Sequence, residues 1–278
     1  MLIIPGLLFA SEPLRIVTWN LEWFPGGERD AGGRARKTHM EKAQKALLEL
    51  DPDVICLQEI RDWQVAEELF SVMPEIRIVV VSAFSGGQQQ VIASKLASDS
   101  AWSAMWKAPG KGELMRGYAF ACLEYRDGIF LLVYSLHLKA NGVGTHASDI
   151  AKREEASSQL LRHVADMEKL YGSRGKAAVI VAGDFNTTLE PDLRFRNETT
   201  LRRLLESGFW WTGTNVPFSQ RVTNEGSGRF APADFDHIFT KALGSPFCWV
   251  PHFEDVSDHQ PVLIEINEAD LNSDLLAR

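Results

Sequence analysis

The sequence is poor in cysteine, with three residues among 278. Cys56, Cys122 and Cys248 show none of the close paired spacings that hold structural zinc, which argues against a zinc-stabilised module. Cys56 and Cys122 lie inside apolar, strand-like segments, where a free thiol behaves as a small hydrophobic group. We therefore expect buried, unpaired thiols.

Long apolar runs are absent beyond the first ten residues. No later segment reaches the ~18 apolar residues that a transmembrane helix needs, and MLIIPGLLFA at the start is too short to span a bilayer. No Lys or Arg precedes this run, so it fits either a shortened secretion signal ending at Ala10 or a plain N-terminal arm. The first alternative implies a secreted or periplasmic protein and the second a cytoplasmic one. We expect no membrane span.

No Pro-, Gly- or Ser-rich linker divides the chain. We therefore expect a single domain at 14–267, with an apolar arm at 1–13 and a tail at 268–278. Basic charge is not in excess either, since 37 acidic against 29 basic residues give a formal net charge of −8. A polyanionic partner would thus need a local basic patch or a divalent cation.

What the sequence does contain is the composition of a globular protein, with 45% hydrophobic and 24% charged residues. Apolar runs bounded by turn residues predict strands at 14–19, 53–58, 76–82, 90–94, 177–186, 235–239 and 261–266. Two further runs between 118 and 138, joined by Arg-Asp-Gly, predict a hairpin. Helical spacing predicts helices at 37–50, 63–72, 148–170 and 199–205, with Ser148 as an N-cap. The order indicates a mixed α/β fold, with 177–186 as a central strand.

Polar side chains follow many of these apolar runs where a strand would end. They are Asn20, Glu59, His137, Asp184, Asn186, Asp236, Asp258 and His259. One carboxylate at a strand end means little, but several carboxylates, amides and imidazoles in such positions describe a metal-assisted site for a phosphate group. The chain is therefore most easily interpreted as a hydrolase.

The motifs around these residues are spread from Asn20 to Val262. In order they are TWNLEW, DVICLQEI, YSLHLKA, VIVAGDFNT, FDHIF and SDHQPV. Together they resemble the endonuclease/exonuclease/phosphatase superfamily, which includes deoxyribonucleases, exonucleases, tyrosyl-DNA phosphodiesterases and neutral sphingomyelinases. The resemblance implies an α/β (α+β) fold: a four-layer sandwich of two packed mixed β-sheets flanked by helices, with the site at the edge that the sheets share.

The oxygen atoms of this set suit a hard divalent cation. Glu59 closes an apolar strand and can be the main ligand of Mg²⁺, which takes few carboxylates and keeps several waters. Asn20 and Asp258 complete the predicted ligand set, and Mn²⁺ and Ca²⁺ are the alternative cofactors. The alternative interpretation of Glu59 is a surface carboxylate that merely ends a strand.

Asp184 and Asn186 are two residues apart in the sequence. On an extended backbone both side chains point to the same side, while Phe185 points into the protein. Such a pair can orient a water molecule and hold a phosphate oxygen. The alternative is a Gly-Asp-x-Asn turn that satisfies its own backbone.

His137 and His259 are the candidate catalytic imidazoles, because histidine can change its charge near neutral pH. The resemblance implies that Asp236 holds one ring nitrogen of His259, which leaves the other to take a proton from water. Asn186 and His137 then stabilise the developing negative charge, and His137 either protonates the leaving oxygen or only donates a hydrogen bond. The family's deoxyribonucleases pair the equivalent of His137 with a glutamate from an earlier strand, where VVVSAFSGGQQQ offers only Ser and Gln. This departure argues against a fully charged His137.

Three basic residues are candidates for contact with the substrate. Arg61, in LQEIRD, resembles an arginine of the family's deoxyribonucleases that reaches into a DNA minor groove; the alternative is a salt bridge with Asp62 or Glu67. Arg116 resembles the family's phosphate-holding arginine, in keeping with bidentate arginine–phosphate hydrogen bonds. Lys139, two residues beyond the first candidate imidazole on an extended strand, either binds phosphate or is solvated.

These residues together predict a Mg²⁺-dependent phosphodiesterase. We expect a DNA endonuclease or exonuclease that acts as a monomer without a stable protein partner. The same site with a different rim would serve a phospholipid, as in a sphingomyelinase, or a small phosphodiester. A non-catalytic binding module is disfavoured because each core position keeps a competent residue.

Overall fold

The structure is a computed structural model. It describes residues 12–107, 113–126, 128–141, 146–190, 195–226, 230–267 and 270. The predicted N-terminal arm and C-terminal tail therefore lie almost wholly outside the described residues. No helix in the described part of the chain is long and apolar enough to cross a membrane.

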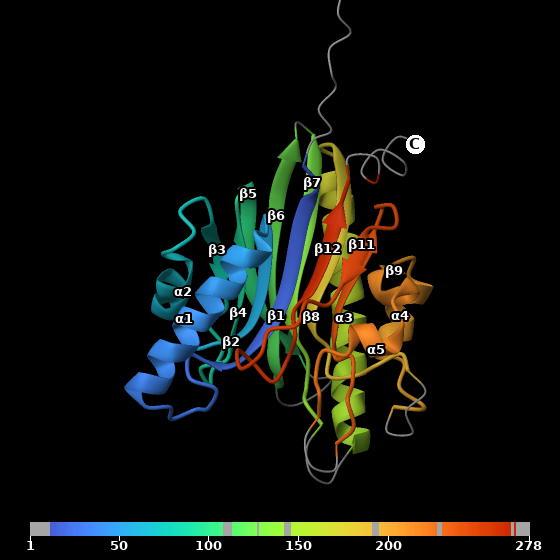
Figure 1. Cartoon of the computed structure of the whole chain (residues 1–278). Coiled ribbons are helices and arrows are strands. Elements are labelled where there is room, and N and C mark those ends of the chain that lie inside the picture. Colours follow the sequence, from blue (N-terminus) through green and yellow to red (C-terminus); the bar gives the residue numbers. More distant parts are fainter. Residues whose placement is uncertain are drawn as a thin grey trace, which may run out of the picture.

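Two six-stranded sheets pack against each other (Figure 1). The first contains, in spatial order, β11 (Phe247–Trp249), β12 (Val262–Ile266), β1 (Leu14–Phe24), β2 (Val54–Ile60), β4 (Gln89–Ser94) and β3 (Arg77–Val81). The second contains β5 (Ala97–Lys107), β6 (Glu113–Arg126), β7 (Ile129–His137), β8 (Lys176–Asp184), β10 (Asp236–Lys241) and β9 (Trp210–Trp211). Both sheets are mixed, since β1 is parallel to β2 but antiparallel to β12, and β8 is parallel to β7 but antiparallel to β10.

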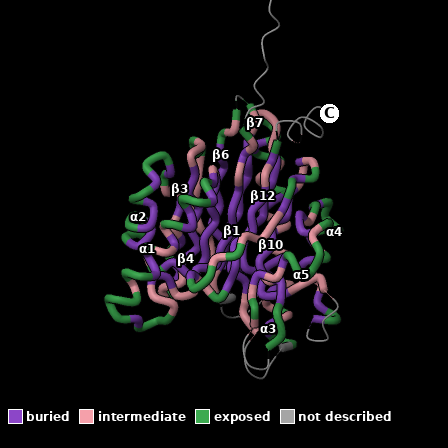
Figure 2. Tube along the Cα trace, viewed as in Figure 1, coloured by how far each residue is buried: buried purple, intermediate pink, exposed green. Residues whose placement is uncertain are grey.

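Helices cover the outer face of each sheet. They are α1 (Gly33–Leu50), α2 (Trp63–Phe70), α3 (His146–Gly172) and α4 (Thr200–Glu206). Two shorter helices, the 3-10 helix η1 (Thr212–Asn215) and α5 (Phe218–Arg221), lie between β9 and β10 in the chain. Buried apolar side chains of α1 and α2 pack on β1, β2 and β4, and those of α3 and α4 pack on β6, β7 and β8. A further apolar cluster fills the space between the sheets, so burial is concentrated on the strands (Figure 2). The predicted four-layer sandwich is confirmed.

A buried polar bridge joins the two sheets. Gln58 Nε2 of β2 donates to Ser135 Oγ of β7 and to Thr18 Oγ1 of β1, each at 3.1 Å. Ser135 Oγ lies 3.4 Å from the Leu57 carbonyl oxygen, and the Gln58, Ser135 and Thr18 side chains have 0% exposure. Because buried polar groups are costly unless they are paired, this bridge favours one alignment of the sheets.

The predicted elements were found, with differences that have physical causes. Two strands, β5 and the three-residue β11, were not predicted. The exposed and half-buried residues of β5 lack a clean apolar alternation at the sheet edge. Ser148 is not an N-cap, because α3 begins at His146. The hairpin is present, with Gly128 at φ 73°, while Asp127 lies outside the described residues. The predicted central strand is β8, and the three cysteines are buried and free as expected.

Candidate active site

Strand direction brings the predicted residues to one edge of the sandwich. Parallel strands end at the same edge of a sheet, and β1 pairs in parallel with β2 as β7 does with β8. In the second sheet Asp184 is the register partner of both His137 and Asp236, so these three residues form a row across neighbouring strands. Glu59 of the first sheet faces this row, with Oε1 3.6 Å from His137 Nε2.

Glu59 is held in place from the first sheet. Its Oε2 accepts a hydrogen bond from the Trp23 backbone N at 2.9 Å, and its backbone has φ 63°, a conformation that is uncommon for residues other than glycine. The carboxylate is therefore turned toward the second sheet instead of following the pleat of β2. This is a central position, unlike that of a surface carboxylate that merely ends a strand.

Asn20 connects the sheets at the site. Its Nδ2 donates to Asp184 Oδ2 at 3.0 Å and lies 3.5 Å from Glu59 Oε1. Its Oδ1 accepts from the Glu22 backbone N at 3.0 Å. Asn20 therefore orients two carboxylates through its amide group, while its oxygen atom is engaged by the backbone.

The predicted common extended backbone of Asp184 and Asn186 is wrong. The strand ends at Asp184, and Asn186 has φ 53°, in the left-handed region. Asp184 Oδ1 accepts from the Asn186 backbone N at 2.8 Å, so the segment is the self-satisfying turn that was the alternative. Asn186 Nδ2 donates to the Leu138 carbonyl oxygen at 3.3 Å, and Phe185 is fully buried as expected. The turn still leaves both polar side chains at the site.

Steric constraints require a glycine at position 183, directly before Asp184. Gly183 has φ 148°, and a Cβ atom there would lie 2.1 Å from the Leu136 carbonyl oxygen of β7. Only glycine lets β7 and β8 approach so closely at the point where they deliver His137 and Asp184.

His259 and Asp236 form the predicted pair. His259 Nδ1 lies 2.6 Å from Asp236 Oδ2, and both residues are buried. Trp19 Nε1 donates to the His259 carbonyl oxygen at 2.8 Å, and Ser257 Oγ accepts from the His259 backbone N at 3.1 Å. The imidazole is thus fixed both through its ring and through its backbone.

Burial and neighbouring charges shift the pKa values of the residues in this cluster. Burial by itself lowers the pKa of His259, but the nearby carboxylates, Asp236 first, raise it to about 10. Burial and the Asp236 carboxylate raise the pKa of Asp184 to about 7. Without a cation, the site therefore favours a protonated His259 paired with Asp236.

Burial of His137 favours its neutral imidazole form. Burial lowers its pKa well below 6.5, and the positive charge of Arg116 adds to the effect. Its Nδ1 is buried and has no hydrogen-bond partner within the described residues, in agreement with the missing carboxylate in VVVSAFSGGQQQ. A neutral His137 suits a hydrogen-bond donor better than a charged general acid.

Asp258 lies at the rim beside an acidic residue that the sequence analysis missed. The exposed Asp258 donates its backbone N to Glu22 Oε2 at 3.3 Å. Burial is the main cause that raises the pKa of the half-buried Glu22. The negative charges of Asp258 and Glu59 raise it further. Glu22 follows Asn20 by two residues, and that short spacing in TWNLEW is the sequence signal that could have found it.

The donor set fits a divalent cation. Glu59, Glu22 and Asp258 offer carboxylate oxygens on one side of the site. Burial, and after it the negative charge of neighbouring carboxylates such as Glu59, raises the pKa of both Glu22 and Asp258. On the other side, ligand atoms of Asp184, Asp236 and His259 lie within 4.8 Å of one another. A protonated His259 repels a cation there, so the Glu59 side is the better place for one.

The three candidate substrate contacts differ in their surroundings. Arg61 pairs through Nε with Asp62 Oδ2 at 2.8 Å on the surface, which is the alternative that the sequence left open. Arg116 Nη2 donates to Gln88 Oε1 at 2.6 Å, and the negative charges of Glu59 and Asp184 act on its guanidinium.

Lys139 follows the end of β7 and is engaged locally. The strand β7 ends at His137, and Lys139 Nζ donates to the Ala140 carbonyl oxygen at 2.9 Å and lies 3.7 Å from Asp149 Oδ1. Strand alternation therefore does not fix the face of its side chain, but its positive charge acts on His137 and lowers the pKa of that ring. Arg116 is the basic residue most closely coupled to the site.

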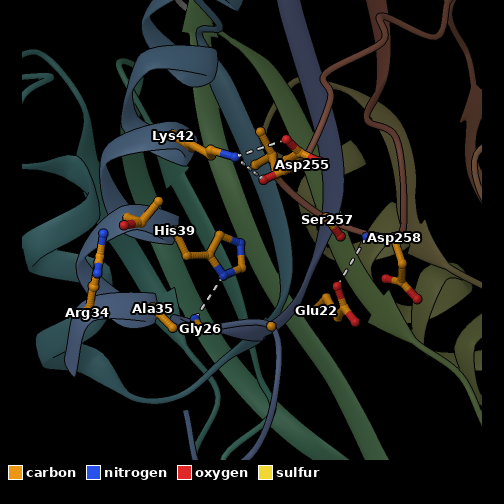
Figure 3. A pocket seen from close by; sticks show the side chains of 12 residues that line it. Glu22, Gly26, Arg34, Ala35, His39, Lys42, Asp255, Ser257 and Asp258 are labelled. Atoms are coloured by element: carbon orange, nitrogen blue, oxygen red, sulfur yellow. Dashed lines mark hydrogen bonds and ion pairs between the residues drawn. The ribbon is translucent and has the colours of Figure 1, made fainter. Parts of the chain in front are cut away.

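A pocket of about 820 Å³ adjoins this rim (Figure 3). Its lining includes Glu22 and Asp258 of the rim together with Arg34, His39, Lys42 and Asp255. Lys42 Nζ lies 3.4 Å from Asp255 Oδ2, and Gly26 N donates to His39 Nδ1 at 2.8 Å. The pocket wall is thus tied to α1.

His39→Asn is expected to reduce the acid sensitivity of the fold. Burial, with a smaller effect of Lys42, lowers the pKa of His39 to about 4, so the neutral ring stabilises the folded state above pH 6.5 and this contribution is lost as the pH falls toward 4. Linkage gives a loss of about 2 kcal/mol by about pH 5. The amide oxygen introduced by the substitution can still accept from Gly26, and urea unfolding at about pH 7.5 and about pH 5 should show a pH effect smaller by that amount. An unchanged pH effect would contradict the assignment.

Comparison with known proteins supports the interpretation of the fold. The sequence model described as the Endonuclease/Exonuclease/phosphatase family matches residues 17–259. Truncated TDP2 from Caenorhabditis elegans has a TM-score of 0.65 at 18% identity, over 91% of this chain and 97% of that one. The structure of SmcL gives 0.68 at 16%, over 92% and 99%. TDP2 from D. rerio, complexed with single strand DNA product, gives 0.65 at 19%, over 91% and 98%. No curated protein matches the chain.

Proposed function

The chain belongs to the endonuclease/exonuclease/phosphatase family, whose members are metal-dependent phosphodiesterases and nucleases, and we propose that it is a Mg²⁺-dependent hydrolase of DNA phosphodiester bonds. The observation that carries this proposal is the meeting of the two sheets in one buried polar centre. His137 Nε2 lies 3.6 Å from Glu59 Oε1 of the first sheet and 3.5 Å from Asp184 Oδ2 of the second. A single phosphate group can therefore contact residues of both sheets.

Glu59 would hold the cation, with Glu22 and Asp258 beside it and Asn20 orienting Glu59 and Asp184. A bound divalent cation supplies positive charge that polarises a non-bridging phosphate oxygen. Mg²⁺ is preferred in this proposal because it needs few protein carboxylates and keeps several waters, whereas Ca²⁺ takes more ligands and Mn²⁺ is the closer substitute. The predicted ligand Asp258 thus remains in the proposal together with Glu22.

His259 and Asp236 would activate the attacking water, with Asp184 beside them. The imidazole of His259 would meet the positive charge of the cation, which favours its neutral, proton-accepting form. Asp236 then orients the ring through Nδ1, at 2.6 Å, and stabilises the imidazolium that forms. His137, as a neutral donor, and Asn186 Nδ2 would stabilise negative charge on the phosphoryl oxygens.

DNA is the preferred substrate in this proposal. Arg116 offers a guanidinium at the edge of the site, and the similar D. rerio TDP2 structure holds a single-strand DNA product. We propose that Arg116 contacts a phosphate and that Arg61 and Lys139 play smaller parts at the rim. We also propose that the protein acts as a monomer. A phospholipid or a small phosphodiester is the rival substrate for the same centre.

A substrate panel separates these possibilities. Purified protein with Mg²⁺ should cleave supercoiled plasmid or a duplex with an abasic site, and EDTA should abolish the cleavage. Sphingomyelin vesicles and bis(4-nitrophenyl) phosphate serve as the lipid and small-molecule arms. Cleavage of sphingomyelin with no cleavage of any DNA would reject the nuclease proposal. The rival proposal, a phospholipid hydrolase, would then be supported.

A further inference from the structure

We propose that Asn141 is a positioning residue for Asn186, and that the buried pair of Arg153 and Glu198 holds Asn141 for that task. The inference rests on the proposed function, because it acts through the donor that Asn186 offers to the phosphoryl group.

The backbone of Asn186 is held on both sides. Its left-handed conformation, at φ 53°, is one that asparagine adopts more readily than most residues with a side chain, and two hydrogen bonds fix its peptide groups here. Its N–H donates to Asp184 Oδ1 at 2.8 Å, and its carbonyl oxygen accepts from Asn141 Nδ2 at 3.0 Å. Asp184 belongs to the catalytic cluster, so Asn141 is the support that comes from outside it.

The orientation of the Asn141 amide is determined by its second partner. Asn141 Oδ1 accepts from Arg153 Nη1 at 3.0 Å. A guanidinium can only donate, so the amide oxygen must face Arg153 and the amide nitrogen must face Asn186. Asn141 therefore cannot rotate by half a turn without placing two donors against each other.

Arg153 is itself fixed from several directions. It has 0% exposure, and its Nε and Nη2 donate to the two carboxylate oxygens of Glu198 at 2.8 and 2.7 Å. Nη1 also donates to the Lys139 carbonyl oxygen at 2.8 Å. A bidentate buried pair has little freedom to move, so it anchors the segment after β7 through both its backbone and Asn141. The hydrogen bonds found for Arg153 all lead to this segment and to Glu198, not to the catalytic cluster.

This support positions one side-chain N–H group of Asn186. Nδ2 uses one N–H for the Leu138 carbonyl oxygen, at 3.3 Å, which leaves the other for a phosphoryl oxygen. Rotation of the Asn186 peptide would move this donor away from where negative charge develops. The loss of a well-placed donor of this kind lowers kcat more than it changes KM.

Asn141→Asp tests the inference with an isosteric change. The aspartate keeps an acceptor for Arg153 but replaces the Nδ2 donor with an oxygen that faces the Asn186 carbonyl. We expect kcat for bis(4-nitrophenyl) phosphate with Mg²⁺ to fall about tenfold, less than the roughly 10²–10³-fold typical of removing such a donor outright, while KM changes less than about threefold. Asn215→Asp, at an exposed position of η1, is the matched control and should leave kcat unchanged.

A double-mutant cycle separates positioning from general damage. If Asn141 acts through Asn186, then Asn141→Asp should have little further effect on kcat in an Asn186→Ala background. Multiplying effects, or an unchanged kcat in Asn141→Asp while Asn186→Ala is slow, would overturn this inference and leave the proposed function intact. An unchanged kcat in Asn186→Ala would reject the role of Asn186 in the proposed function, and the inference with it. The melting temperature of each variant shows whether the protein remains folded.

Discussion

His259→Ala is expected to lower kcat on an activated phosphodiester roughly 10³-fold, because proton transfer by a positioned side chain contributes about 10²–10⁴-fold. The ring lies 2.6 Å from Asp236, and its ligand atoms group with those of Asp184 within 4.8 Å. Removal of the imidazole eliminates the proton acceptor and leaves two buried carboxylates without their positive partner. Steady-state kinetics with saturating Mg²⁺ measures the effect, and circular dichroism shows whether the fold persists.

The pH profile supplies a second measurement for the same variant. The pKa of His259 is raised, to about 10 without a cation, so its neutral fraction grows as the pH rises and kcat/KM should rise with it between about pH 6 and about pH 9. The variant should lose this rise. His252→Ala, on the exposed part of the segment before β12, is the control. A fall of less than about tenfold in the His259 variant would exclude its role as the base.

Glu59→Gln is the second large effect that we expect. The substitution keeps the shape of the side chain and an acceptor for the Trp23 backbone N, but it removes the charge that would hold the cation. We expect kcat/KM to fall about 10²-fold or more at about 1 mM Mg²⁺, with partial recovery as the Mg²⁺ concentration rises. A Mg²⁺ titration of the rate distinguishes weaker metal binding from a lost chemical step.

Glu67→Gln is the matched control for this charge change. Glu67 is exposed on α2 and should leave the titration unchanged. If the Glu59 variant keeps the activity and the Mg²⁺ dependence of the parent protein, the cation does not depend on Glu59. The acidic cluster of Asp184 and Asp236 would then be the next candidate for the ligand set.

The sequence predicted the fold because its strands are marked by strong local signals. The apolar runs that end at Asn20, Glu59 and Asp184 are long and sharply bounded, and the hydrophobic pattern that makes a strand also fixes where its last polar residue lies. β5 escaped prediction because an edge strand with exposed serines carries no such pattern. The packing of the two sheets against each other was predicted from the resemblance of the motifs to a known family, because hydrophobic periodicity alone does not show which sheets pack together.

The finer geometry of the site could not be predicted from local patterns. Asn186 leaves the extended backbone because the Asp184 side chain captures its N–H, and the same letters are equally compatible with a strand. Asn141 reaches Asn186 across 45 positions of the sequence, and Arg153 reaches Glu198 across the same separation. Partners so far apart follow from packing, as do the opposite pKa shifts of His137 and His259.

The hydrogen bond from Gln58 to Ser135 joins two sheets that each carry part of the reaction centre. Glu59 belongs to one sheet and His137 to the other, so the distance between Glu59 Oε1 and His137 Nε2 depends on the spacing of the sheets. A change of one methylene group deep in the interior, far from any substrate, would shift that spacing and alter the rate before it unfolds the protein. Substitutions at interior positions between the two sheets can therefore change kcat without altering any residue that contacts the substrate.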